Sequence, residues 1–311
     1  MTTPPDAVHL GRSTRIGFAI VDVFAVAPLT GNALAVVPDA DALDVRTMRA
    51  IAREFNQSET TFLVRPGMPG ATWRLRSFTP GGHEVGGAGH NALGAWLWLA
   101  HAGRVGAGTF TQQIGGDVLP VEVAVAADEP TRVTMAQSAP WFGRVPPDRA
   151  ELAAALGLSD DDLVPHRPAQ VVSTGAGHLL VPVVSRRVVD RVAVDTARLL
   201  AVLAAAGGEG CYVYTMAAAE PADGAHAYAR FFNPAMGIVE DPATGTAAGP
   251  LAAFLTRHGD VAAGRPVLIQ QGDATRRPSR LQIEVDGARV RITGTGLVVG
   301  TGRLTVRADG G

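Results

Sequence analysis

The sequence predicts an α+β protein built from two similar domains. Strand-like segments outnumber helical ones in both halves, and they do not alternate with helices as a parallel βαβ array requires. The pentapeptide RSFTP at 76–80 reappears as RFFNP at 230–234, and each copy precedes a loop rich in Gly and Ala and then an apolar helix. This repeat indicates a pair of domains related by a pseudo-twofold axis.

The first domain is expected to begin with a strand, because residues 16–25 are rich in β-branched and aromatic side chains. Helically spaced apolar residues predict a helix over 45–55. Further strands are expected in the segments GNALAVV, ETTFLV, TWRLRSF, GDVLPVEVAV and TRVTMAQ. We expect residues 1–14 to be a disordered lead, which places the first domain at 15–137.

The second domain is placed at 138–311, because a stretch with several prolines follows the last of these strands. A short capped helix is expected near Asp148, and a longer helix over 196–207. The expected strands are HLLVPVV, GCYVYTM, AHAYARFF, the hairpin SRLQIEVDGARVRITG and the final GRLTVRA. The alternative in which this final strand returns to the first domain stays open.

Composition favours small-molecule chemistry. Of the 311 residues only 18% are charged, the formal net charge is −2, and no basic stripe marks a surface for nucleic acid or an acidic membrane. The N-terminus lacks the pattern of a signal peptide, and no apolar run has the length of a membrane span. We therefore expect a cytoplasmic protein with a small-molecule partner.

Two residue counts narrow the chemistry further. The single cysteine, Cys211, allows no internal disulfide and no cysteine metal cluster, and its strand-like surroundings suggest a core residue. The absence of lysine excludes a pyridoxal-phosphate aldimine, a Schiff-base aldolase and a P-loop of the GxxxxGK[ST] type. His83 and Glu84 do not form an HExxH motif, so no metal site is predicted.

The segment EDPATGTAAGPLAAF at 240–254 predicts a helix that starts with small residues. If the equivalent helix of the first domain faces it across a cleft, free backbone N–H groups and helix dipoles would bind a carboxylate without a cationic side chain. Gly245 and Ala247 would allow close approach, and Thr246 would add a hydroxyl. In the structural alternative, Asp241 caps this helix and the small residues only permit tight packing.

Two other polar residues have ordinary explanations when each is taken alone. His90 could be a helix-start residue bonded to the backbone, and Glu59 could be a solvated acid between a helix and a strand. The residue types alone leave both alternatives open.

Three motifs together resemble the PhzF family of phenazine-biosynthesis isomerases: NQSETTF, FTPGGHEVGGAGHNALGA and EDPATGTAAGPLAAFL. The resemblance also includes STGAGHLLVPV and QGDATRRPSRLQIEV, and it extends over nearly the whole chain from about Ile16. It implies a diaminopimelate-epimerase-like fold, with two similar domains that each wrap a curled mixed β-sheet around a central helix. It further implies a homodimer that uses no metal or organic cofactor.

The family's functional residues can be placed on this chain. The resemblance implies the catalytic residues Glu59, His90 and Asp241, and the substrate-binding residues Gly89, Asn91, Gly245, Thr246 and Ala247. The implied reaction is a proton shift like that of trans-2,3-dihydro-3-hydroxyanthranilate isomerase, in secondary metabolism. A carboxylate shielded in a cleft suits this reaction, because its raised pKa lets it take a proton from carbon and return it elsewhere.

One departure from the family and two alternative functions accompany this prediction. Gly86 and Gly87 stand where family members usually have Pro-Phe, which predicts a more open wall beside His90. A two-base amino-acid epimerase on the same fold is disfavoured, because that chemistry uses a pair of cysteines. A non-catalytic protein that binds a carboxylate metabolite is the second alternative.

Overall fold

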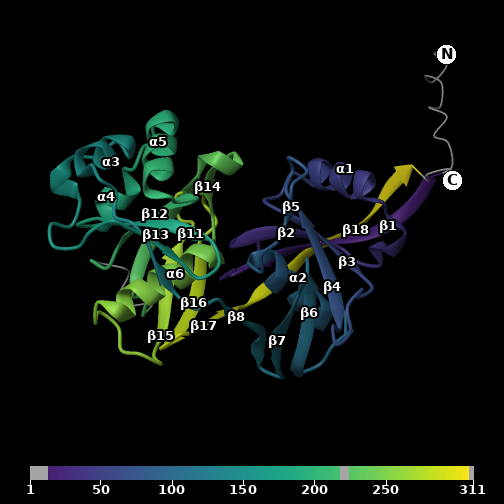
Figure 1. The fold of residues 1–311 in the computed structure, drawn as a ribbon. Coiled ribbons are helices and arrows are strands. Elements are labelled where there is room, and N and C mark those ends of the chain that lie inside the picture. Colours follow the sequence, from purple (N-terminus) through teal and green to yellow (C-terminus); the bar gives the residue numbers. More distant parts are fainter. Residues whose placement is uncertain (1–12, 218–223, 308–311) are drawn as a thin grey trace, which may run out of the picture.

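The structure, a computed structural model, describes residues 13–217 and 224–307 and consists of two matching halves (Figure 1). Of the predicted disordered lead, residues 1–12 lie outside the described residues, whereas Ser13 and Thr14 belong to the first strand.

The first half contains the elements up to Gln137. They are β1 (Ser13–Val23), β2 (Asn32–Val37), the 3-10 helix η1 (Ala40–Ala42), α1 (Val45–Phe55), β3 (Thr60–Val64), β4 (Trp73–Phe78), β5 (Glu84–Val85), α2 (His90–His101), β6 (Gly108–Ile114), β7 (Asp117–Ala126) and β8 (Glu129–Gln137).

The elements from Trp141 to Gly294 belong to the second half, and the last strand of the described chain returns to the sheet of the first half. The elements are β9 (Trp141–Phe142), α3 (Arg149–Ala155), η2 (Asp160–Asp162), β10 (Gln170–Ser173), β11 (Gly177–Pro182), α4 (Arg186–Asp190), α5 (Thr196–Ala206), β12 (Gly210–Thr215), β13 (Ala227–Asn233), η4 (Pro234–Met236), β14 (Ile238–Asp241), α6 (Gly245–Arg257), β15 (Pro266–Gln271), β16 (Ser279–Asp286), β17 (Arg289–Gly294) and β18 (Gly296–Arg307).

Both halves use the same strand order. The first runs β18-β1-β2-β3-β4-β6-β7-β8 with β5 also on β4, and the second runs β9-β10-β11-β12-β13-β15-β16-β17 with β14 also on β13. The parallel pairs fall at the same places, β2–β3 and β4–β6 in one half and β11–β12 and β13–β15 in the other. The predicted repeat and fold class are therefore confirmed.

Each half buries one central helix in its curled sheet (Figure 1). Every residue of α2 from His90 to Leu99 is buried, and α6 is buried from Ala247 to Leu255. Helices that are apolar on all sides are stable only when protein surrounds them, because burial removes their apolar surface from water. In contrast α1 buries one face, with Met48, Ile51 and Ala52 inward.

Two strand pairings connect the halves. β8 pairs with β17 across the boundary, and β18 runs back to pair with β1 along its length (Figure 1). The motif QGDATRRPSRLQIEV adds a polar link, in which Arg277 donates to Asp22 Oδ1 at 2.6 Å and to the Gly31 carbonyl at 2.7 Å. Asp22 is buried, so this ion pair fixes the β1–β2 turn against the second half.

The sequence predicted the long elements better than the short ones. The helix over 45–55 is confirmed as α1, and Asp148 caps α3 by accepting from the Glu151 N–H. It did not predict β5, β9, β10 or β14, strands of two to four residues, which depend on pairing with neighbouring strands. It also missed the longer strands β6 and β15, of seven and six residues. Within residues 13–217 and 224–307, no helix is long and apolar enough to cross a membrane.

Candidate active site

Glu59 and His90 are brought together from two different elements. Glu59 directly precedes β3, and His90 is the first residue of α2. Glu59 Oε2 lies 3.0 Å from His90 Nδ1, and the two side chains are only 17% and 9% exposed. Neither Glu59 Oε2 nor His90 Nε2 has an aligned hydrogen-bond partner among the described residues. Such unpaired buried atoms are costly, and they are common at functional sites.

Burial sets the protonation of both groups. It raises the pKa of Glu59 from 4.5 to about 7, because the carboxylate loses hydration and no cation compensates for it. Burial also lowers the pKa of His90, an effect that the charge of Asp241 partly opposes. Near neutral pH Glu59 therefore exists in both protonation states while His90 is neutral, which suits proton transfer.

Asp241 is the last residue of β14, and it lies close enough to Glu59 and His90 for their charges to affect its pKa. Its Oδ1 accepts from Asn32 Nδ2 at 2.9 Å and from Ser58 Oγ at 3.4 Å, and its Oδ2 accepts from Thr244 Oγ1 at 2.5 Å. Burial, together with the charge of Glu59, raises the pKa of Asp241. The alternative in which Asp241 caps α6 is wrong, because Thr244 is the N-cap of α6 and the Asp241 carboxylate accepts hydrogen bonds from side chains.

The starts of α2 and α6 meet at this site. A Cβ atom on Gly89 would lie 3.6 Å from Thr246 Cγ2, so the two helix N-termini are in contact across the halves. The N–H groups of Gly245 and Thr246 have no acceptor within the described residues, whereas that of Ala247 donates to the Thr244 carbonyl at 3.1 Å. Gly245 and Thr246 therefore remain able to bind an anion, while the backbone of Ala247 is already engaged.

Comparison with known proteins identifies the family. The model of the phenazine biosynthesis-like protein family matches residues 21–302. The chain belongs to the phenazine biosynthesis-like (PhzF) family. It is 34% identical to the trans-2,3-dihydro-3-hydroxyanthranilate isomerase of Pseudomonas fluorescens, over 93% of this chain and 99% of that protein. The resemblance found in the motifs is thus confirmed, and the chain is an isomerase of PhzF type.

Solved structures agree with this membership. A phenazine biosynthesis protein of the PhzF family from Bacillus anthracis has a TM-score of 0.86 at 26% identity, covering 94% of this chain and 99% of that one. A predicted epimerase from Pseudomonas aeruginosa has a TM-score of 0.79 at 36% identity, again with coverage of 94% and 99%. The similarity therefore includes both halves.

The side chain of Asn91 bonds within the protein, and the predicted contact of this residue with substrate stays a prediction. Its Oδ1 accepts from the Gly89 N–H at 2.7 Å, and its Nδ2 donates to Ser77 Oγ and to the Gly87 carbonyl, each at 3.1 Å. The side chain is buried and both of its polar atoms are engaged. Asn91 therefore holds the loop that precedes His90, and its N–H at the start of α2 is the group that remains for an anion.

Sequence reasoning missed four residues that hold Asp241 in this PhzF-family site. Asn32, Ser58 and Thr244 bond to its carboxylate, and Gln271 donates to its backbone carbonyl at 2.7 Å. Ser58, Thr244 and Gln271 lie within the recognised motifs, which was the available signal, whereas Asn32 lies in the expected strand segment GNALAVV. Asn32 and Ser58 come from the first half, so the aspartate of one domain is oriented partly by the other.

The two glycines that depart from the family pattern lie in open space. A Cβ atom on Gly86 or Gly87 would meet nothing within 4 Å, and both residues are exposed. The more open wall that the departure predicts beside His90 stays a prediction.

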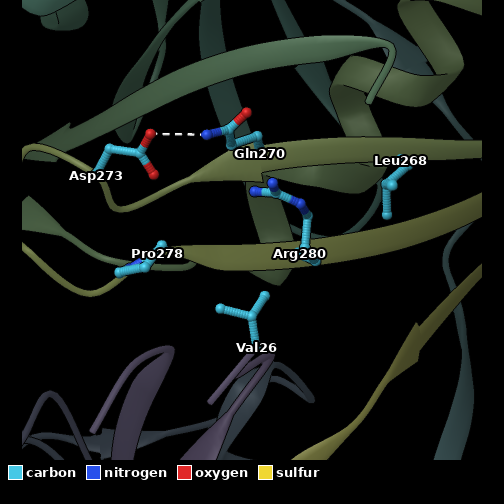
Figure 2. A pocket seen from close by; sticks show the side chains of 6 residues that line it. All are labelled: Val26, Leu268, Gln270, Asp273, Pro278 and Arg280. Atoms are coloured by element: carbon cyan, nitrogen blue, oxygen red, sulfur yellow. Dashed lines mark hydrogen bonds between the residues drawn. The ribbon is translucent and has the colours of Figure 1, made fainter. Parts of the chain in front are cut away.

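A separate groove of about 810 Å³ lies on the other face of β15, lined by Val26, Leu268, Gln270, Asp273, Pro278 and Arg280 (Figure 2). Gln270 donates to Asp273 Oδ2 at 2.7 Å in this groove, whereas its neighbour Gln271 bonds to Asp241. Because successive strand residues point to opposite faces, the groove is distinct from the site of Glu59. Within the described part of the chain, no three His, Cys, Asp or Glu side chains are grouped to hold a metal ion.

Proposed function

We propose that this protein is a cofactor-independent isomerase that moves a proton within an unsaturated cyclic amino acid such as trans-2,3-dihydro-3-hydroxyanthranilate. The observation that carries the proposal is the buried Glu59 carboxyl group, which has a pKa of about 7 and lies 3.0 Å from His90 beside two helix N-termini. The substrate is the compound named for the Pseudomonas fluorescens relative.

In this mechanism Glu59 acts first as a base and then as an acid. Its carboxylate takes a proton from a ring carbon, and the electron pair of that C–H bond enters the conjugated double bonds. The protonated Glu59 then returns the proton to another carbon of the same system. A base with a pKa near the working pH is effective in both steps.

Substrate orientation falls to the groups around Glu59. The N–H groups of Gly245 and Thr246 would bind the substrate carboxylate, since the positive end of the helix dipole favours an anion. The unpaired Nε2 of His90 and the anchored carboxylate of Asp241 would hold amino or hydroxyl groups. Together these contacts would present one ring carbon to Glu59.

The epimerase alternative gains no support from the position of the cysteine. Cys211 is fully buried in β12, and this burial raises the pKa of its thiol. A thiol in that state is a poor base. Independence from cofactors, a homodimeric state and a cytoplasmic location stay predictions of the sequence, and sedimentation analysis of the purified protein tests the dimer.

Deuterium exchange tests the proposed reaction. The wild type, Glu59→Gln and the control Glu54→Gln are incubated in deuterated water with trans-2,3-dihydro-3-hydroxyanthranilate and related cyclic amino acids. We expect NMR and mass spectrometry to show isomerised product with deuterium on carbon for the wild type and the control, in which only an exposed acid of α1 is changed. Glu59→Gln should be slower by roughly 10³-fold, in the range of general acid–base catalysis.

Two outcomes would contradict the proposal. An undiminished rate in Glu59→Gln would exclude the acid–base role of Glu59. Calorimetric binding of the carboxylate compounds without chemical change over a long incubation would instead favour the non-catalytic binding protein.

A further inference from the structure

His178 is a buried histidine that the mechanism above does not use. It begins the apolar part of β11 within the motif STGAGHLLVPV, and it is only 3% exposed. Its Nε2 lies 3.3 Å from Thr246 Oγ1, the hydroxyl at the start of α6. Its Nδ1 has no hydrogen-bond partner among the described residues. A buried imidazole with a single polar contact needs an explanation.

The matching half shows that packing alone does not require a histidine at this position. His178 pairs with Gly210 in the parallel β11–β12 ladder. Gly210 corresponds to Glu59, because Tyr212 pairs with Phe231 as Thr61 pairs with Ser77. The β2–β3 ladder pairs Ala35 with Thr60, so the residue opposite Glu59 is Leu34. Leu34 occupies the position of His178 in the first half, and it is fully buried. The same position in the strand is therefore filled by leucine in the first half and by a histidine with one unpaired ring nitrogen in the second.

The surroundings of the ring determine which nitrogen carries the proton. The Phe231 ring packs edge-on against His178 with centroids 4.9 Å apart, and a Cβ atom on Gly210 would lie 3.2 Å from Nδ1. Burial lowers the pKa of His178 to about 4, so the ring is neutral and carries one N–H. An unpaired N–H is the rarer defect in protein interiors, so the proton belongs on Nε2, where Thr246 accepts it.

This contact frees the hydroxyl proton of Thr246. When Oγ1 accepts from His178, its own O–H has no other partner within the described residues and can point into the cleft. The Thr246 methyl group lies 3.6 Å from the position of a Cβ on Gly89, so the methyl and hydroxyl contacts together define one rotamer. The hydroxyl is thereby oriented next to the free N–H groups at the start of α6.

We propose that His178 is a positioning residue that fixes the Thr246 hydroxyl as a hydrogen-bond donor to the substrate carboxylate. The inference rests on the proposed function, in which the start of α6 binds that carboxylate. His178 itself acts only through Thr246, so its effect should depend on whether the ligand carries a carboxylate.

Calorimetry with two ligands tests this assignment. The aromatic counterpart of the substrate, 3-hydroxyanthranilate, carries the carboxylate, whereas 2-aminophenol lacks it. We expect His178→Leu, which copies the first half, to weaken 3-hydroxyanthranilate binding about 10-fold, the scale of one hydrogen bond to a charged group. Binding of 2-aminophenol should stay within about 2-fold, because no carboxylate is present to lose that bond.

Two further variants separate positioning from packing. His178→Gln places an amide near the Nε2 position and should recover most of the affinity for 3-hydroxyanthranilate. Thr246→Val removes the hydroxyl while keeping the shape, so adding His178→Leu to it should weaken binding no further. Thermal unfolding of each variant shows whether it is folded.

The outcomes distinguish this inference from the proposed function. If His178→Leu weakens both ligands equally, or neither, the positioning role is overturned while a carboxylate preference of the wild type still supports the site. If the wild type binds both ligands equally, the carboxylate site and the inference are overturned together. The proton-shuttle role of Glu59 is tested separately by deuterium exchange.

Discussion

The two halves repeat one frame but have different residues at its key positions. RSFTP and RFFNP place Arg76 and Arg230 alike, and each forms a two-point ion pair with a glutamate on the short neighbouring strand, Glu84 or Glu240. The next ladder positions differ, because Ser77 faces Val85 whereas Phe231 faces Asp241. The polar anchor therefore exists in one half only.

A second difference runs in the opposite direction. Thr61 pairs with Ser77, and Tyr212 pairs with the equivalent residue Phe231, so Thr61 and Tyr212 occupy equivalent positions. Glu59 and Gly210 each lie two residues earlier, and Gly210 therefore occupies the position of Glu59. In the proposed mechanism the first half thus supplies the acid–base group, and the second supplies Asp241 and the start of α6. A repeated fold can in this way divide proton transfer and substrate binding between its copies, and contact between the halves then becomes part of the proposed site.

The largest difference in stability that we expect between the halves concerns the ion pairs of Arg76 and Arg230. Arg230→Met should lower the free energy of unfolding by roughly 3–5 kcal/mol, because it leaves a buried glutamate unpaired. Arg230 and Glu240 side chains are 10% and 14% exposed, and Arg230 also donates to the Val189 and Val192 carbonyls. Arg76→Met should cost about 1 kcal/mol or less, because Glu84 is 41% exposed. Urea unfolding of both variants measures the two values, and equal losses would contradict this ranking.

The dependence of kcat/KM on pH tests whether Glu59 of the first half is the base. With a Glu59 pKa of about 7, kcat/KM should rise with pH through that value and level off above it. At pH 5 only about one part in 100 of Glu59 is ionised, so the rate should be roughly 100-fold below the plateau. A rate that is level from pH 5 to pH 8 would show that ionised Glu59 is not the base.

The same shift predicts how stability depends on pH. The folded-state pKa of Glu59 lies above its ordinary value of 4.5, so the folded protein holds the proton more tightly. This contribution is fully present below about pH 4.5 and is lost as the pH rises through about 7. The Tm of Glu59→Gln relative to wild type should therefore increase from pH 5 to pH 8. A constant difference would contradict the raised pKa.

A smaller effect is expected at the glycine that corresponds to Glu59. A Cβ atom on Gly210 would lie 2.5 Å from Phe231 Cζ, so Gly210→Ala should destabilise the fold by about 1–3 kcal/mol through overpacking. Gly86→Ala is the matched control, because nothing lies within 4 Å of its Cβ position. If both variants unfold at the same urea concentration, the Phe231 ring moves aside without loss of stability, and the predicted overpacking at residue 210 is wrong.

How far the sequence predicted this arrangement depends on the range of the interactions. The α1 helix and the repeat were visible locally, because period and pentapeptide spacing are properties of neighbouring residues. The residues Glu59, His90 and Asp241 were identified from the resemblance to the family. Their arrangement in space could be described only from the folded structure. Asn32 could not be predicted, because its contact with Asp241 joins residues 209 positions apart. The bond from the Gly89 N–H to the Asn91 amide oxygen could not be predicted either, because burial of an amide is not a local property.

The smallest stability effect is expected where this chain departs from its family. Gly87→Phe should change the free energy of unfolding by no more than about 0.5 kcal/mol, because the position is exposed and open. The ring would restore an aromatic wall beside His90, so KM should change several-fold for bulky cyclic amino acids and less for small ones. Steady-state kinetics over a size series measures this. If every substrate responds alike, the ring lies outside the cleft, and the open wall contributes nothing to specificity.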